Sequence, residues 1–160
     1  MMTYFRKALL ISLLAACFGL LGACAEKQSS EVSSNETTVR SKKGDGDMIR
    51  LRINGTEFHV VLEKNSAAKK LQEILPDTFS MNDLHQNEKY YDLSQKLPTN
   101  AQRVGMIEAG DVMLYGNSTL VIFYHSFETS YSYTRIGRIK NEGNLADQLG
   151  NGALKVERIH

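Results

Sequence analysis

The chain has 160 residues and carries 19 Lys and Arg against 18 Asp and Glu, which gives a formal net charge of +1 at pH 7. A near-neutral chain without basic clusters does not have the pattern of a nucleic-acid-binding protein. Its two cysteines both lie within the first 24 residues, so residues 25–160 hold no thiol for a disulfide or a metal. The folded part must therefore be stabilised by packing.

The N-terminus predicts export and lipidation. Two basic residues precede a largely apolar run from Ala8 to Ala23, which is typical of an export signal. The run ends in LGAC, which resembles the lipobox of bacterial lipoproteins. This resemblance implies that residues 1–23 are a cleaved signal peptide and that Cys24 carries the lipid, which makes the membrane a partner through the anchor. It implies a bacterial cell-envelope protein outside the cytoplasm, on the outer membrane if the organism has two membranes.

Two alternatives stay open for this segment. A second match, LAAC ending at Cys17, leaves an apolar stretch that is short for a signal, and an uncleaved anchor helix would give nearly the same topology. Residues 24–47 then read as the lipidated Cys24 and a flexible linker, because they contain no aromatic residue, Leu or Ile and are rich in Ser, Thr, Lys and Glu. The folded domain is expected over residues 48–160.

The domain begins with a predicted hairpin and a helix. Alternating residues in MIRLRI and TEFHVVL flank Asn54 and Gly55, and Asn-Gly between two alternating runs is a strong hairpin signal. The segment NSAAKKLQEILP then places apolar residues on one stripe, with Asn65 or Ser66 as the cap and Pro76 as the stop. We expect an amphipathic helix of about ten residues there.

The rest of the domain is predicted to be mainly β. A loop-rich stretch from Asp77 to Arg103 contains short strands near 79–84 and 89–93. Further strands are predicted at 111–115, 119–124, 134–139 and 153–159, with a short helix at 144–149. The unbroken apolar run LVIFY indicates a strand covered on both faces, and the spacing of Ile136 and Ile139 requires a bulge at Gly137. These elements favour a closed β-barrel of about eight strands with two helices over its ends.

The segments AGDVMLYG and YSYTRIG, in this order of elements, resemble the bacterial cyclophilin-like family, whose members are sometimes encoded beside or fused to flavodoxins. The resemblance covers nearly all of residues 48–160 and implies a cyclophilin-like barrel. It also raises an accessory role to a flavodoxin-like redox protein as an alternative function, although no residue pattern here indicates a flavin site. We predict no cofactor.

The resemblance also raises prolyl isomerase activity. True cyclophilins use an Arg in a Phe-His-Arg strand segment and a Gln-x-Phe element, and the matching segments here are TFSMNDL and Thr119 to Val121. Both the donor and the ring are missing, so we expect a binding module without isomerase activity and assign no catalytic residue. The alternative is an isomerase with rearranged catalytic groups, in which Arg103 would be the donor if its loop folds over the open barrel face.

Candidate ligand-binding residues follow from the aromatic segment FYHSFETSYSYTRIGRI. Two Tyr and an Arg alternate along one strand face, a set suited to stacking and hydrogen bonding with a peptide, protein or small molecule. The candidates are Arg103, Tyr124, Tyr131, Tyr133 and Arg135. The alternative is a packed Tyr ladder with Arg135 paired to Glu128 or Glu108.

Metal and acid-base chemistry have weaker support. His59, His85 and His125 are not at ligand spacing, so no metal site is predicted. Glu88 and Asp92 would share one face of an extended segment, but a solvated loop or a salt bridge to a lysine explains them better.

Overall fold

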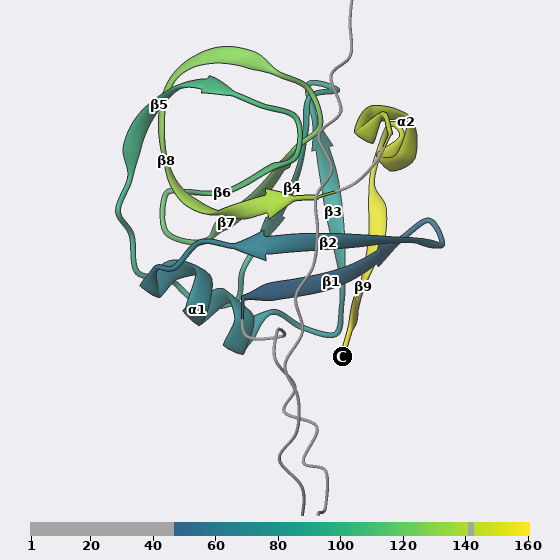
Figure 1. The fold of residues 1–160 in the computed structure, drawn as a ribbon, viewed down its shortest axis with the longest axis horizontal. Helices are drawn as coiled ribbons and strands as arrows, with labels where there is room; N and C mark the ends of the chain where they lie inside the picture. Colours follow the sequence, from purple (N-terminus) through teal and green to yellow (C-terminus); the bar gives the residue numbers. More distant parts are fainter. Residues whose placement is uncertain (1–46, 141–142) are drawn as a thin grey trace, which may run out of the picture. The chain divides into compact units, whose positions relative to one another are not determined.

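The computed structural model describes residues 47–140 and 143–160, where it forms nine strands and two helices (Figure 1). The first five elements are β1 (Met48–Ile53), β2 (Thr56–Leu62), α1 (Ser66–Ile74), β3 (Thr78–Leu84) and β4 (Glu88–Asp92). The other six are β5 (Gln102–Ile107), β6 (Asp111–Tyr115), β7 (Thr119–Phe123), β8 (Phe127–Ile139), α2 (Leu145–Leu149) and β9 (Leu154–Ile159).

The predictions for the signal peptide, for the lipidated Cys24 with its alternative Cys17, and for the linker up to residue 46 lie outside the described residues. Neither α1 nor α2 has the length and apolar character needed to cross a membrane, a statement that covers only the described part of the chain.

Eight strands close into a barrel. They run in the order β2, β1, β9, β3, β4, β7, β6, β8, and a further pairing of β8 with β2 closes the ring. All pairings are antiparallel. The ninth strand, β5, pairs only with the first half of β8, and the two arch away from the barrel in Figure 1. The predicted closed barrel of about eight strands with two helices is confirmed.

Local signals account for the first elements. Asn54 and Gly55 have φ values of 50° and 80°, as a two-residue hairpin turn with two left-handed residues requires. The side chain of Asn65 caps α1 by accepting a hydrogen bond of 2.9 Å from the backbone N–H of Ala68. The helix ends before Pro76 and buries Leu71 in the barrel core. The predicted hairpin and helix are therefore confirmed.

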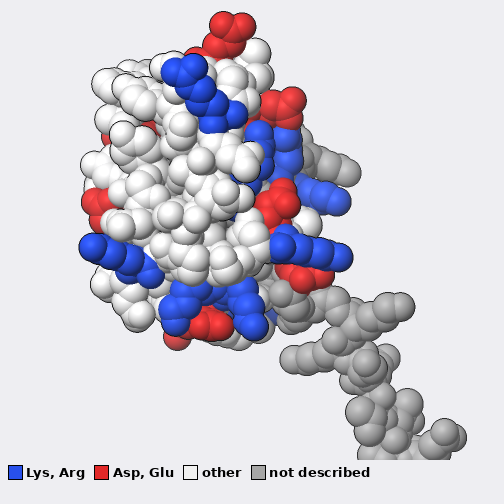
Figure 2. All heavy atoms as spheres, turned by 90° about the vertical axis from the view of Figure 1, so that its left-hand side faces the viewer, with Lys and Arg blue, Asp and Glu red and all other residues white. Residues whose placement is uncertain are grey.

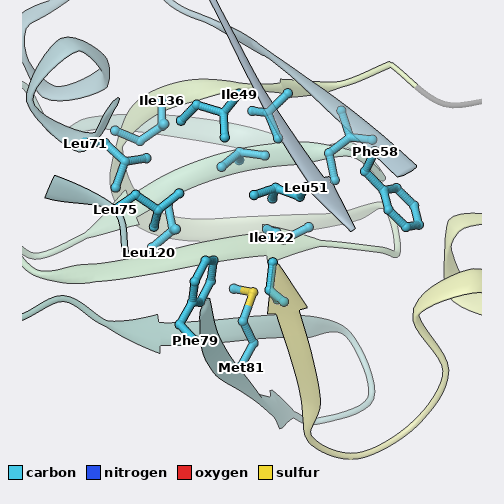
Figure 3. Close-up of a cluster of buried hydrophobic side chains, with 14 of the residues drawn as sticks. Ile49, Leu51, Phe58, Leu71, Leu75, Phe79, Met81, Leu120, Ile122 and Ile136 are labelled. Atoms are coloured by element: carbon cyan, nitrogen blue, oxygen red, sulfur yellow. The ribbon is translucent and has the colours of Figure 1, made fainter. Parts of the chain in front are cut away.

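The barrel core and a second, smaller core lie on opposite faces of β7. Leu120 and Ile122 face the barrel core, shown in Figure 3 together with side chains of β1 to β3 and α1. Val121 and Phe123 belong instead to a second cluster, completed by Ile107, Met113 and Tyr133. Both faces of β7 are thus covered, which explains the unbroken apolar run LVIFY and confirms its interpretation.

The predicted bulge next to Gly137 is present. Val112 of β6 pairs with Gly137, whereas Met113 pairs with Arg135, so Ile136 is the extra residue. Gly137 is also the point where β8 meets β2, because a Cβ there would lie 2.3 Å from the carbonyl oxygen of Val61. A glycine is needed here for close backbone approach.

One strand was not predicted, and another was predicted too short. No strand was predicted at 102–107, and β8 begins seven residues before the predicted start at 134. The side chains of β5 are mostly exposed or half-buried, and Gly105 (φ 72°) interrupts the pairing, so β5 shows no apolar alternation. On the side that carries β5 and the bend of β8, Figure 2 shows a broad uncharged area bordered by charged side chains.

Candidate ligand-binding site

A cavity of about 610 Å³ lies on the outer side of the barrel, between β4, β6, β7 and the first half of β8. We call it the tyrosine cavity, after the four tyrosines in its lining. Its lining residues are Leu84, His85, Asn87, Glu88, Tyr90, Asp92, Tyr115, Thr119, Val121, Phe127, Glu128, Thr129, Ser130, Tyr131 and Tyr133.

The strand period places one face of β4 in this cavity. Glu88, Tyr90 and Asp92 alternate along the strand and line the cavity, whereas Lys89 is fully buried on the other side. In the neighbouring β7, Val121 pairs directly with Tyr90. Because paired residues point to the same face of a sheet, β4 and β7 together form one wall.

Edge-to-face contacts fix the aromatic wall. The ring of Tyr115 lies 6.1 Å from that of Tyr131 in a T-shaped arrangement and 5.7 Å from that of Tyr133. Tyr133 in turn makes an edge contact of 5.5 Å with Phe123 of the second core. Tyr133 is buried, whereas Tyr115 and Tyr131 are 48% and 60% exposed. The wall therefore has a packed base and two accessible rings, a distribution typical of binding surfaces.

The electrostatics of the tyrosine cavity are acidic. Its lining includes the carboxylates of Glu88, Asp92 and Glu128 and contains neither Lys nor Arg. Burial raises the pKa of Glu88 above its usual range; the charge of His85 partly offsets this, and Asp83 adds to it. Burial, with smaller contributions from neighbouring groups, raises the pKa of Tyr133 to about 12, so its hydroxyl stays protonated at neutral pH and can donate a hydrogen bond.

A second cavity of about 350 Å³ adjoins the start of β5, and we call it the arginine cavity. Its lining residues are Asn65, Asn100, Gln102, Arg103, Val104, Tyr133, Thr134 and Arg135. Side-chain amides and guanidinium groups make up most of this lining. The guanidinium of Arg135 lies 3.8 Å from the carboxylate of Asp111. The backbone carbonyl of Arg135 accepts a hydrogen bond of 2.8 Å from the side chain of Asn65.

The structure distributes the sequence-predicted site residues over three places. Tyr131 and Tyr133 line the tyrosine cavity, and Arg103 and Arg135 line the arginine cavity together with Tyr133. Tyr124 is buried, and its hydroxyl donates a hydrogen bond of 2.7 Å to Asp83. The predicted set therefore does not line a single pocket.

The alternative partners predicted for Arg135 also differ from the observed one. Arg135 pairs with Asp111, whereas Glu108 accepts a hydrogen bond from Arg138. Glu128 instead lines the tyrosine cavity.

Sequence reasoning missed Tyr90 and Tyr115 as cavity residues. The alternation in EKYYD was the available signal for Tyr90, since it puts Tyr90 on the same face as the pair Glu88 and Asp92. Tyr115 gave no such signal, because it reaches the cavity only through the pairing of β6 with β8. Across residues 47–140 and 143–160, no three His, Cys, Asp or Glu side chains are grouped in a way that could hold a metal ion.

Comparisons with known proteins place the fold. A family model described as the cyclophilin-like family matches residues 51–157. Among solved structures, the solution structure of a hypothetical protein from Archaeoglobus fulgidus is similar, with a TM-score of 0.52 and 21% sequence identity over 74% of this chain and 99% of that chain. This likeness concerns the fold alone. No curated protein matches the sequence.

Proposed function

This chain belongs to the cyclophilin-like family, and we propose that its domain is a membrane-tethered, extracytoplasmic binding module without prolyl isomerase activity. The observation that carries the proposal is the tyrosine cavity, which combines accessible aromatic rings with polar groups on the outer face of the sheet. Tyr side chains offer a large apolar surface and a hydroxyl at low conformational cost, which suits them to binding.

The lining of the tyrosine cavity supports binding over isomerase catalysis. Rotation about a prolyl bond faces a barrier of about 20 kcal/mol. True cyclophilins lower this barrier with a guanidinium that donates a hydrogen bond to the prolyl nitrogen. The tyrosine cavity has no Arg or Lys in its lining. Arg103 lies in the arginine cavity beside Gln102 and Arg135, where the apolar surface that a proline ring would need is supplied only by Val104 and the ring of Tyr133.

The binding function is tested by an alanine pair. An array of short peptides and small fragments is screened against the full chain, and hits are measured for Tyr131→Ala and Arg135→Ala. We expect Tyr131→Ala to weaken the hits about tenfold or more without lowering the melting temperature, because the ring is 60% exposed. Arg135→Ala should leave the affinities unchanged. Hits that survive Tyr131→Ala, or a screen that yields none, would contradict the proposal.

The membrane tether is proposed from the LGAC segment and the polar linker that follows it. Its test is the substitution Cys24→Ser, which removes the thiol that would carry the lipid. The variant should lose acyl label and move from the detergent phase to the aqueous phase in a partitioning experiment. Cys17→Ser is the matched control and should keep both. A Cys24→Ser protein that retains label and partitioning would disprove the lipid anchor.

A further inference from the structure

Resting on the binding function above, we propose that the tyrosine cavity recognises a cationic side chain, Arg or Lys, in an extended peptide segment. The inference combines three features of the described residues: carboxylates without a cationic partner, exposed aromatic rings beside them, and a neighbouring hollow that continues the cavity along β8.

The carboxylates of the cavity form no ion pair with a Lys or Arg of the described residues. Elsewhere on the barrel most acidic side chains have a basic partner, as Asp83 has Lys89 and Asp111 has Arg138. Among the described residues, neither Glu88 nor Glu128 forms an ion pair or accepts a side-chain hydrogen bond. Asp92 accepts only a neutral hydrogen bond of 2.7 Å, from the hydroxyl of Thr119. A ligand cation would supply the missing charge.

Burial makes this need strongest at Glu88. The side chain is half-buried in the cavity wall, and its loss of solvation is what raises its pKa. A cation placed beside it would offset that desolvation and favour the ionised carboxylate. The charge of His85, which also lines the cavity, offsets only part of that desolvation.

The aromatic wall adds a second attraction for a cation. Tyr115 and Tyr131 are both about half exposed and both line the cavity, so each ring offers aromatic surface to a ligand in addition to their T-shaped contact. Guanidinium and ammonium groups bind favourably over aromatic faces, and a guanidinium also stacks on them. Rings next to unpaired carboxylates therefore favour Arg, and then Lys, over neutral or acidic side chains.

The shape of the surface favours a peptide over a small free cation. A shallow hollow of about 490 Å³ adjoins the cavity, because Glu128, Thr129 and Ser130 line both. Gly105 and Met106 of β5 form the rest of its lining, and Met106 is 48% exposed. A single side chain would fill only part of the cavity, whereas an extended segment could place its neighbouring residues along this hollow.

The test uses the full chain in a non-ionic detergent and acetylated, amidated pentapeptides with Gly at every position except the central one. The central residue is Arg, Lys, norleucine or Glu, and agmatine serves as a guanidinium without a peptide backbone. We expect the Arg peptide to bind about tenfold tighter than the norleucine and Glu peptides and than agmatine. Its affinity should fall with added salt.

Two variants locate the interaction. Glu88→Gln should weaken the Arg peptide about fivefold or more and leave the norleucine peptide unchanged, and it should fold well because it removes a desolvated charge. Glu63→Gln, the same change at an exposed site away from the cavity, should have no effect. Equal binding of the norleucine peptide, or an unchanged affinity in Glu88→Gln, would overturn the cation specificity.

The remaining outcomes separate this inference from the binding function. If neutral or acidic peptides bind best and Tyr131→Ala still weakens them, the cavity is a binding site but its ligand is not cationic. If agmatine binds as tightly as the Arg peptide, the ligand is a small cation and not a peptide. If no probe in the set binds and the earlier screen yields no hit that depends on Tyr131, both proposals fail together.

Discussion

Lys89 shows how one residue ties distant parts of the barrel together. It lies on β4 between two residues of the tyrosine cavity, yet its side chain is fully buried on the opposite face. The ammonium group donates hydrogen bonds of 2.6 Å to Asp83, 2.7 Å to the carbonyl of Gly150 and 2.7 Å to the carbonyl of Gly152. All three N–H donors are used, so the charge is paired and the turn before β9 is held against β4.

We predict that Lys89→Met lowers the free energy of unfolding by about 3 to 5 kcal/mol. Met has a similar volume but cannot donate hydrogen bonds to the carbonyls of Gly150 and Gly152, and it leaves the charge of Asp83 without its ion-pair partner. The control is Lys155→Met, whose 68% exposed side chain should contribute no more than about 0.5 kcal/mol. Urea unfolding at pH 7 measures both, and equal losses in the two variants would show that the buried network is not stabilising.

Asp83 makes stability depend on pH. Burial disfavours its ionised form, but hydrogen bonds from Lys89, from Tyr124 and from the backbone N–H of Gln86 outweigh it and lower its pKa below the usual 3.8. A carboxylate whose pKa is lower in the folded state contributes stability that is complete above its unfolded pKa and is lost as the pH falls through the folded pKa. The contribution of Asp83 should therefore begin to be lost below about pH 4 and shrink further as the pH falls.

We predict that Asp83→Asn is less stable than the parent protein at pH 7 and that the difference shrinks as the pH falls from 4 to 2. Urea unfolding at several pH values gives the two curves. Asp47→Asn, which changes an exposed carboxylate, should run parallel to the parent. A gap between Asp83→Asn and the parent that stays constant down to pH 2 would contradict the role assigned to the ionised carboxylate.

At the scale of elements, β8 joins the barrel to the binding wall. Its second half pairs with β6 and closes the ring on β2, while its first half pairs with β5 and carries Tyr131 and Tyr133. The bulge at Ile136 lies within the second half, directly before Gly137, where β8 meets β2. Because both halves belong to one strand, the closure of the barrel also sets the position of the aromatic wall.

We predict that Gly137→Ala destabilises the domain by about 1 to 3 kcal/mol, because the added methyl group would lie 2.3 Å from the carbonyl oxygen of Val61 and push β8 away from β2. Ser132→Ala, at an exposed position on the same strand, should change stability by less than about 0.5 kcal/mol. Thermal unfolding measures both. A Gly137→Ala protein as stable as the parent would mean that the strands separate at no cost.

The elements differ in how far sequence could predict them. The hairpin at Asn54 and the cap at Asn65 depend on residues within a few positions of one another in the sequence, so local rules predicted both. β5 depends on pairing with the first half of β8, and its mostly exposed residues carry no pattern of their own. The same distinction applies to the site. Tyr131 and Tyr133 were found from alternation in one segment, whereas Tyr115 joins them only after the barrel has closed.

At the scale of the whole molecule, the described domain is organised as two cores that share β7. The barrel core holds side chains from β1, β2, β3, β9 and both helices. The second core packs β5 and the first half of β8, which together we call the arch, onto the outside of β6 and β7. The tyrosine cavity borders this second core through Val121, Phe127 and Tyr133. The arch thus supplies a wall to the site without taking part in the closure of the barrel.

We predict that residues 47–160 alone fold and do not accelerate X-Pro isomerisation. Starting at Asp47 retains the backbone hydrogen bond of 2.8 Å from Leu62 to its carbonyl, and the apolar core begins at Ile49. True cyclophilins need a guanidinium donor beside an apolar pocket, whereas the lining of the tyrosine cavity has no basic side chain except that of His85. Circular dichroism tests folding, and a protease-coupled assay on an Ala-Pro peptide tests catalysis.

The controls of this assay separate the two functions. Rates that stay at background while the fragment melts cooperatively agree with a binding module. Rates that rise in proportion to the fragment and fall in Arg103→Ala would instead make the protein an isomerase whose donor lies in the arginine cavity. Arg50→Ala is the matched control, because Arg50 is half-buried on β1 and lines neither the tyrosine cavity nor the arginine cavity. It should leave any rate unchanged. A fall in both variants would point to unfolding, which the melting curve detects independently, so the role of Arg103 is decided by the difference between them.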